Sequence, residues 1–336
     1  MIYGKITLED WRTACVEGEE PESSFESYNL RLFFFGTLYN RDTLQATPDD
    51  TNAKLAADAF LSDPAYGFSR LDGSFTIVYY SENECGVVRD HHGTHYPVYC
   101  HIDGNFATSW QFLEDQLEEN FEPNLVSLST FLQRGILKKN NFALFDVHSL
   151  GAGEKFYMLT ELGYLMPVWA SVKLETQANV HSMFDSLKER NPSLYEKVAD
   201  DIYCLKRDSV FEHEPKVATE RNPDVETYSR RYGELHAQAI RRRIGHSRRV
   251  GILLSGGYDS GSNLAALRSI YDGQIDSYSV GFKGDAWTEL PMARLMSETF
   301  GTRHHEYEID GTETSALPDI VSILGAPIME GGLMVN

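Results

Sequence analysis

The sequence predicts an α+β layered domain followed by an α/β domain with a doubly wound parallel sheet. Three observations predict this arrangement. The first 165 residues read as short strands, rich in β-branched and aromatic residues and separated by turn signals. From about Val225 helices and strands alternate regularly. A glycine-rich string, Leu254–Ser260 (LSGGYDS), follows an apolar strand and opens a helix. The length of 336 residues suits two domains.

In the first part, we expect strands where apolar and aromatic residues cluster between turns, at Arg31–Phe35, Ser74–Tyr80, Gly86–Arg89, Tyr96–Cys100 and Lys155–Leu159. Helical patterns intervene at Asp50–Phe60, Trp110–Glu119 and Leu128–Arg134. The domain is therefore expected over residues 1–170. Residues 171–224 are polar and broken by three prolines, which favours a helical linker or insertion.

Residues 225–336 show the βαβαβ order of a parallel sheet. A helical stripe is formed by Tyr228, Tyr232, Leu235 and Ala239. The strand Val250–Leu254 has no polar alternation, so we expect both of its faces to be buried. A second helix carries Leu264, Leu267 and Tyr271. Strand Ile275–Phe282, a helix over Trp287–Phe300 that stops at Gly301, and strand His304–Ile309 complete the pattern.

Composition narrows the classes of partner. The chain has 30 Lys and Arg against 50 Asp and Glu, a formal net charge of −20, which is the wrong sign for binding nucleic acid or an anionic membrane by bulk charge. Its four cysteines have no metal-ligand spacing and are too few for a disulfide framework. No leader or spanning apolar segment is evident. These features predict a cytoplasmic protein.

The string Leu254–Ser260 has the properties of an anion-binding loop. It lies where a parallel strand ends and a helix begins, so free backbone N–H groups and the positive end of the helix dipole meet there. Gly256 and Gly257 allow close approach of a phosphate group, and Ser255 and Ser260 add hydroxyl donors. The alternative is a glycine-rich turn with a capping side chain.

Two common phosphate loops are excluded, because the chain has neither GxxxxGK[ST] nor GxGxxG followed by an acidic residue. Asp259 would repel phosphate unless a cation lies between them. We therefore expect Asp259 to bind Mg²⁺ shared with the phosphates.

Segment Val250–Ile309 resembles the pyrophosphate-loop ATPase domain of the asparagine synthetase family, which includes β-lactam synthetases and lasso-peptide cyclases. The resemblance rests on the loop, on Ser279-Val280-Gly281-Phe282, and on Gly301-Thr302-Arg303-His304-His305-Glu306. It implies an adenine nucleotide alpha-hydrolase-like fold, ATP and Mg²⁺ as cofactors, and cleavage of ATP between its α and β phosphates to form an acyl-adenylate. The nucleotide-binding residues it implies are Leu254, Ser255, Gly256, Gly257, Asp259, Ser260, Val280 and Gly281, with Asp259 as the metal ligand and backbone groups of Val280 and Gly281 meeting adenine.

The first part resembles the same family's glutaminase domain, of the N-terminal-nucleophile-hydrolase type. Gly36–Asn40 (GTLYN), Leu71–Phe75 (LDGSF) and Arg89–Gly93 (RDHHG) are similar to its motifs. The family's amino-terminal cysteine is replaced by Met1-Ile2-Tyr3-Gly4, and Phe35 stands where the family has an asparagine oxyanion donor. The resemblance therefore implies a degenerate domain without glutaminase activity.

The family's second acidic motif and its lysine would fall beyond Asn336. We therefore expect only the first half of the synthetase domain here, with its site completed by a longer chain or by a partner chain; a homodimer is left open. The leading function is an AMP-forming carboxylate–amine ligase acting on a small-molecule or peptide carboxylate, as in asparagine biosynthesis. The alternatives are an intramolecular cyclase that forms a β-lactam or macrolactam, and a non-catalytic nucleotide-binding scaffold. No catalytic residue is assigned.

Three further features have plain interpretations. The cluster His91, His92 and His95 favours a surface or core role over metal binding. The Arg241–Arg249 run favours a solvated helix end over a phosphate or partner site. Glu289 could touch substrate, although an exposed helical carboxylate is the simpler interpretation.

Overall fold

The computed structural model describes residues 1–6, 11–64, 67–101, 104–117, 124–126, 128–129, 147–159, 168–171, 224–284, 288–310, 312–316 and 318–319. The chain divides into two compact units. The first comprises Met1–Lys216 and Val321–Met329, and the second Val217–Ile320 and Glu330–Asn336. Each unit is described by itself.

Two antiparallel sheets form the centre of the first unit. The six-stranded sheet has the order β11-β10-β6-β5-β4-β3. Its strands are β3 (Ser23–Glu26), β4 (Leu30–Leu38), β5 (Gly73–Ser81), β6 (Glu84–Arg89), β10 (Glu154–Leu159) and β11 (Val168–Ser171). The five-stranded sheet has the order β2-β1-β8-β7-β9. Its strands are β1 (Ile2–Lys5), β2 (Val16–Gly18), β7 (Val98–His101), β8 (Asn105–Ala107) and β9 (Val147–Leu150).

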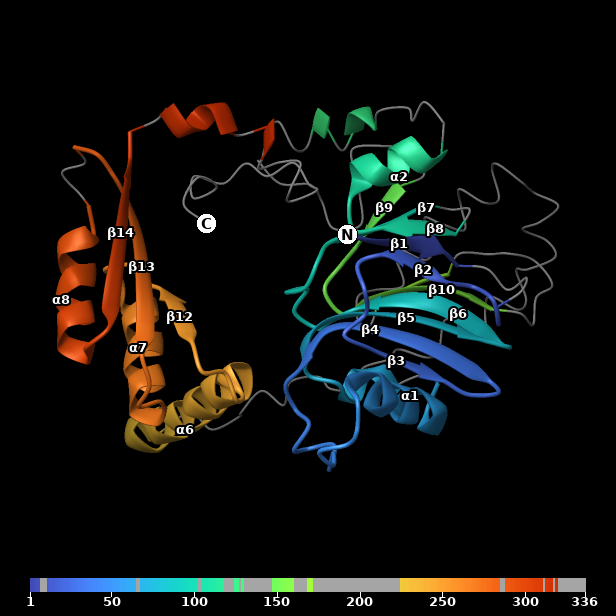
Figure 1. Ribbon diagram of the computed structural model, residues 1–336, viewed down its shortest axis with the longest axis horizontal. Helices are drawn as coiled ribbons and strands as arrows, with labels where there is room; N and C mark the ends of the chain where they lie inside the picture. The colour runs from blue at the N-terminus through green and yellow to red at the C-terminus, as the bar shows by residue number, and fades with distance from the viewer. Residues whose placement is uncertain are drawn as a thin grey trace. The chain divides into compact units, whose positions relative to one another are not determined.

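Three apolar clusters stack these sheets and two helices into four layers (Figure 1). The central cluster lies between the sheets and includes Ile2, Phe35, Val78 and Phe106. A second cluster packs helix α1 (Asn52–Ser62) and the 3₁₀ turn η1 (Gly67–Arg70) on the six-stranded sheet. A third packs helix α2 (Trp110–Leu117) on the five-stranded sheet. The predicted α+β layered domain is confirmed at this level.

A buried ion pair joins β6 and β10 in the six-stranded sheet. Lys155 Nζ is 2.9 Å from Glu84 Oε1, and both side chains are almost fully buried. The same carboxylate oxygen accepts a hydrogen bond from the Tyr79 hydroxyl, and the ammonium lies 4.0 Å from the centre of the Tyr157 ring. Burial, followed by the Glu84 charge and hydrogen bond, raises the pKa of Tyr79 well above its usual value. These partners satisfy charges that burial alone would make costly.

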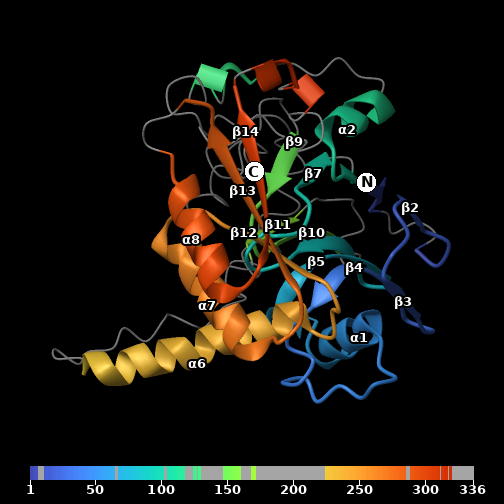
Figure 2. The ribbon, with the colours of Figure 1, turned by 60° about the vertical axis from the view of Figure 1, so that its left-hand side comes forward.

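The second unit contains a three-stranded parallel sheet in the order β12-β13-β14. Its strands are β12 (Val250–Leu253), β13 (Ile275–Phe282) and β14 (Arg303–Ile309). Helices α6 (Val225–Ile244), α7 (Tyr258–Ile270) and α8 (Leu290–Phe300) precede or connect the strands, and the turn η2 (Thr312–Ala316) follows (Figure 2). α8 ends at Gly301, whose φ of 62° is the left-handed conformation that glycine adopts most easily. The predicted βαβαβ order is confirmed.

The described helices of this unit pack through one apolar cluster. It joins Leu264 and Leu267 of α7 and Ala293 of α8 to Val250 and Ile275 of the sheet, with Ile240 and Ile244 of α6 at its margin. The opposite face of the sheet carries Leu253, Tyr278, Val280, Phe282 and Tyr307, with exposed fractions between 37% and 65%. Within the described residues only one face is therefore covered, and they include no second helical layer of the kind that a doubly wound sheet has.

The prediction that strand Val250–Leu254 is buried on both faces was wrong. Gly251 and Leu253 are exposed, whereas Val250 and Leu254 are buried. The physical reason is that helices cover one face of β12 in the described part of the chain, so an apolar residue on the other face stays accessible. The apolar stripe of α6 is also exposed. Tyr228, Tyr232 and Leu235 lie on the expected helix, but their exposed fractions are 47–65%.

Some expectations fall outside the described residues. The 171–224 linker does so except for Ser171 and Asp224, and the helix over Leu128–Arg134 does so except for Leu128 and Ser129. Among the helices that the structure describes, none is both long and apolar enough to cross a membrane.

Candidate nucleotide-binding site

The predicted anion-binding loop lies where the sequence places it. Residues 254–257 connect the end of β12 to the first residue of α7, Tyr258. Leu254 is buried, its N–H donates to the Tyr278 carbonyl oxygen at 2.8 Å, and its own carbonyl oxygen accepts from the Ser279 hydroxyl. The loop therefore starts from a fixed strand end and opens at the carboxyl edge of the sheet.

The two serines of the loop hold its shape. Ser260 Oγ lies 2.9 Å from Ser255 Oγ and accepts the Ser255 N–H at 3.1 Å. Ser255 Oγ also accepts the Gly257 N–H at 3.1 Å. Among the described residues, outside the chain neighbours of Gly257 and the backbone of its own helix, a Cβ added at Gly257 would come within 4 Å of Ser255 Oγ alone, at 3.2 Å. The described part of the chain therefore leaves space on that side of the loop, as a phosphate-binding loop requires.

The first turn of α7 presents backbone donors and one carboxylate. Gly257 is the N-cap and makes no side-chain cap hydrogen bond, so the first-turn N–H groups lack the acceptor that a serine or aspartate cap supplies. Asp259 is exposed in this first turn. The structure thus brings together the predicted residues Ser255, Gly256, Gly257, Asp259 and Ser260 in one turn of chain.

Helix α8 closes one side of the loop. The Gly256 N–H donates to Glu289 Oε2 at 3.1 Å. A Cβ at Gly256 would lie 2.8 Å from Glu289 Cβ and 2.9 Å from its carbonyl oxygen, so only glycine allows this approach. Glu289 is exposed, as the sequence interpretation expected, but its contact with Gly256 was not predicted, because residues 33 positions apart make it.

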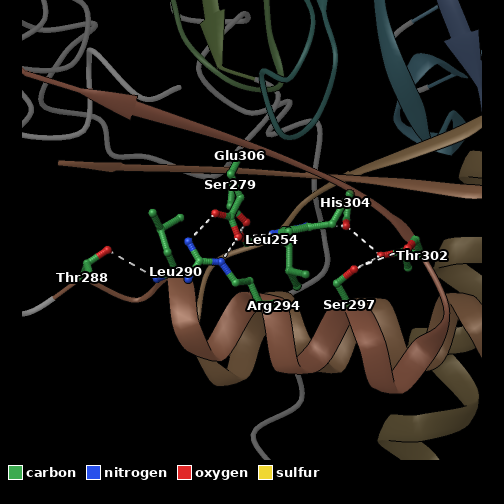
Figure 3. A network of polar contacts seen from close by, with 10 residues as sticks. Leu254, Ser279, Thr288, Leu290, Arg294, Ser297, Thr302, His304 and Glu306 are labelled. Carbon is green, nitrogen blue, oxygen red and sulfur yellow. Dashed lines mark hydrogen bonds and ion pairs between the residues drawn. The ribbon is translucent and has the colours of Figure 1, made fainter. Parts of the chain in front are cut away.

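A polar network fixes α8 against the sheet (Figure 3). Arg294 forms two hydrogen bonds of 2.6 Å with the carboxylate of Glu306 on β14. Ser297 Oγ lies 2.6 Å from Thr302 Oγ1, and the Ser277 hydroxyl lies 2.8 Å from His304 Nδ1. Hydrogen bonds from Arg294 lower the pKa of Glu306. The family-like string Gly301–Glu306 therefore has a structural role in holding the helix beside the loop.

The predicted adenine-contacting residues lie on β13 next to the loop. The last backbone hydrogen bond between β12 and β13 in the described residues ends at the Tyr278 carbonyl oxygen. Backbone groups alternate sides along a parallel strand, so those of Val280 point the same way as those of Tyr278, past the end of β12. Gly281 lies under α8, where an added Cβ would be 2.7 Å from Leu290 Cδ1.

The glutaminase-like motifs of the first unit make structural contacts with one another. Asn40 donates to the Arg70 carbonyl oxygen at 2.8 Å and accepts the Asp72 N–H at 2.9 Å. The Asp90 carboxylate accepts backbone N–H groups of His92, Thr94 and His95 at 2.9–3.1 Å. Burial alone would raise the pKa of Asp90, but these hydrogen bonds lower it overall.

Phe35, at the position of the family's asparagine, is buried between the sheets. Two of the described cysteines are also buried: the pKa of Cys85 is raised to about 12, mainly by burial, and that of Cys100 is raised as well. Cys15 is exposed, and Cys204 lies outside the described residues.

The other sequence candidates make local contacts within their own units. His95 Nδ1 lies 2.9 Å from Thr76 Oγ1, and His91 Nε2 lies 3.1 Å from the Ser69 carbonyl oxygen. Arg241, Arg242 and Arg243 form the last turn of α6, where positive charge complements the helix dipole. Among the described residues no group of three His, Cys, Asp or Glu side chains is arranged to hold a metal ion.

Comparison with known proteins finds similarity mainly in the second unit. Residues 231–333 match the family model described as asparagine synthase. Proteins from Mycobacterium bovis and Mycobacterium tuberculosis, provisionally named asparagine synthetase (glutamine-hydrolyzing), are 33% identical over 86 residues. This match covers 25% of the chain and 13% of each of those proteins.

Two solved structures are weakly similar over most of the chain. One is the glutamine phosphoribosylpyrophosphate amidotransferase of B. subtilis with ADP and GMP, at 12% identity, covering 86% of this chain and 74% of that one, with a TM-score of 0.32. The other is described as the allosteric regulatory enzyme of purine biosynthesis, at 12% identity, 87% and 63% coverage, and a TM-score of 0.32. Similarity at this level supports no conclusion about function.

Proposed function

We propose that the chain is part of an ATP-dependent, AMP-forming carboxylate–amine ligase without glutaminase activity, because residues 231–333 match the family model described as asparagine synthase. The observation that carries the proposal is the Ser255–Ser260 turn, which combines the first-turn N–H groups of α7, which have no side-chain cap, with two hydroxyls and an exposed carboxylate at the carboxyl end of a parallel strand. The curated relatives are matched over 13% of their length, so the activity of the whole protein is part of this proposal.

The residues present fit Mg²⁺·ATP. The first-turn N–H groups of α7 and the hydroxyl of Ser255 would hold the β and γ phosphates, and the exposed Asp259 would bind Mg²⁺ through its carboxylate oxygens. The open side of Gly257 leaves room for a phosphate group. The backbone of Val280, directed past the end of β12, would meet the adenine ring, whereas the backbone groups of Gly281 alternate to the β14 side of the strand. Mg²⁺, when bound, neutralises charge on the phosphates.

The proposed reaction transfers adenylate. A carboxylate oxygen of the substrate attacks the α phosphorus, and the bond from that phosphorus to the bridging oxygen breaks, releasing pyrophosphate. An amine then attacks the carbonyl carbon of the acyl-adenylate, and AMP leaves. Donors that hold the departing pyrophosphate stabilise charge as it develops, which is where such contacts accelerate a reaction.

The amine would be free ammonia or an amine of the substrate itself. Phe35 offers no oxyanion donor, and both buried thiols of the described residues have raised pKa values and so remain protonated at neutral pH. If the amine belongs to the substrate, the same chemistry closes a β-lactam or macrolactam ring.

Nucleotide binding is tested by calorimetric titration of Mg²⁺·ATP. Asp259→Asn should weaken binding about ten- to a hundredfold, since a hydrogen bond to a charged group contributes about 1.5–3 kcal/mol. Asp272→Asn is the matched control: it removes the same charge from an exposed residue at the far end of α7, roughly 20 Å away. Equal affinity of wild type and Asp259→Asn would contradict the assignment.

The reaction class is tested by ATP–pyrophosphate exchange with aspartate and with a panel of amino-bearing carboxylates, with and without a neighbouring-gene subunit. Carboxylate-dependent exchange supports a ligase, and a cyclised product identifies the intramolecular variant. Release of ADP would contradict AMP formation. Nucleotide binding without exchange in any mixture would favour the non-catalytic scaffold.

A further inference from the structure

The contact between Glu289 and the loop uses a donor that the proposed ligand needs. Gly256 N–H is a backbone donor within the anion-binding turn, and in the structure it donates to Glu289 Oε2 at 3.1 Å. A carboxylate oxygen and a phosphate oxygen are both anionic acceptors for such a group, and one N–H directed at the carboxylate cannot equally serve a phosphate. Glu289 therefore occupies part of the turn.

The position of Glu289 makes this contact unusual for its place in the fold. It is the N-cap residue of α8, where a side-chain oxygen normally accepts a hydrogen bond from its own helix, but it makes no such cap. Its backbone is held against Gly256, as the close approach to an added Cβ shows. The side chain thus faces the loop rather than its own helix, and it brings a negative charge there.

We propose that Glu289 is an internal anionic occupant of the phosphate-binding loop, which the nucleotide must displace, and that it selects for metal-complexed nucleotide. This inference rests on the proposed function. After displacement the carboxylate stays beside the phosphates, because its backbone is fixed by α8. It repels metal-free ATP or pyrophosphate more strongly than the Mg²⁺ complex, whose net negative charge is smaller. Glu289 would therefore determine the specificity of the loop for the Mg²⁺ complex over the metal-free ligand.

The expected effect follows from competition. Suppose that the ligand binds only those protein molecules in which the Glu289 carboxylate is displaced from the loop. Its apparent affinity is then the intrinsic affinity multiplied by the fraction of such molecules. An occupant present in about nine molecules of ten lowers affinity about tenfold. Glu289→Gln keeps the shape of the side chain but removes its charge, so we expect pyrophosphate without metal to bind about three- to tenfold more tightly. For Mg²⁺·ATP we expect a smaller gain, so the preference for the metal complex declines.

The experiment compares wild type, Glu289→Gln and Glu298→Gln by calorimetric titration with sodium pyrophosphate in EDTA and with Mg²⁺·ATP. Glu298 is exposed on the same helix nine residues away, roughly 13 Å along its axis and beyond the screening length of about 8–10 Å. Glu298→Gln should therefore leave the affinities for pyrophosphate and for Mg²⁺·ATP within twofold of wild type. Amide hydrogen exchange of the ligand-free protein provides a second readout, because Gly256 N–H should exchange faster in Glu289→Ala than in wild type.

The outcomes separate the inference from the proposed function. Equal affinity of wild type and Glu289→Gln for metal-free pyrophosphate overturns the inference, and Mg²⁺·ATP binding by both proteins then leaves the function standing. Weaker binding by Glu289→Gln also overturns it, because Glu289 would then hold the ligand or its metal. If all three proteins fail to bind nucleotide, the proposed function is overturned, and the inference with it.

Discussion

Replacing Gly281 by alanine tests the packing of α8 on the sheet. The added Cβ would lie 2.7 Å from Leu290 Cδ1, 2.9 Å from Leu290 Cγ and 3.2 Å from Thr288 Oγ1. Carbon atoms in contact normally lie about 3.5–4.0 Å apart, so the overlap with Leu290 is roughly 1 Å. Leu290 is 4% exposed and is the first residue of α8, so it cannot simply turn into solvent.

The free energy of unfolding should fall by about 1–3 kcal/mol, the usual cost of inserting a methyl group into a packed site. Gly251→Ala is the matched control in the neighbouring strand. Its added Cβ would lie 3.5 Å from Tyr278 Cε2, which is an ordinary van der Waals contact. Alanine also lowers the conformational entropy of the unfolded chain relative to glycine. That substitution should therefore be neutral or stabilising by up to about 1 kcal/mol.

Hydrogen exchange measured by mass spectrometry is the suitable assay, because the chain has two units and a single unfolding transition is not assured. Peptides from β13 and α8 report the local free energy of opening, and peptides from β5 serve as an internal reference in the other unit. If Gly281→Ala protects β13 and α8 as well as Gly251→Ala does, the packing argument is wrong.

Three further predictions concern the first unit. Because the folded pKa of Asp90 is depressed, its contribution to stability is present above the unfolded pKa of about 3.9 and is lost as pH falls through the folded value; Asp90→Asn should flatten the acid limb of a pH–stability curve. Lys155→Met should lower the free energy of unfolding by about 3–5 kcal/mol, because it leaves Glu84 charged and buried; urea denaturation showing less than about 1 kcal/mol would refute this. We expect no glutamate release from glutamine, because Phe35 lacks a donor; release above a protein-free blank, with wild type or Cys15→Ser, would contradict it.

Local sequence signals predicted β4, β5, β6, β7 and β10 in the first unit, where apolar and aromatic residues cluster, but not β1, β2, β3, β8, β9 and β11. Strand Ile275–Phe282 of the second unit has the predicted bounds. Gly301 marked the end of α8, because a left-handed residue is needed there. The loop at Ser255–Ser260 was also predictable, since its serines and glycines act within six residues of chain.

Features that depend on contacts between distant segments were not predictable in this way. The Glu84–Lys155 pair joins residues 71 positions apart, and the Gly256–Glu289 contact joins residues 33 positions apart. Neither spacing has a sequence signature. The exposure of Leu253 was missed for a related reason: an apolar run is compatible with one covered face or with two, and only the placement of helices decides between them.

The orientation of Val280 has a consequence for how a ligand beside the loop is distinguished from its analogues. Main-chain atoms, rather than a side chain, point past the end of β12 at this position. Every amino acid except proline offers the same N–H and carbonyl oxygen, so point substitution at Val280 leaves that pattern of donors and acceptors intact. Deletion of one residue within β13 would instead turn the opposite set of backbone groups toward the site. The selectivity of this edge is thus encoded in the register of β13 rather than in the identity of any one side chain.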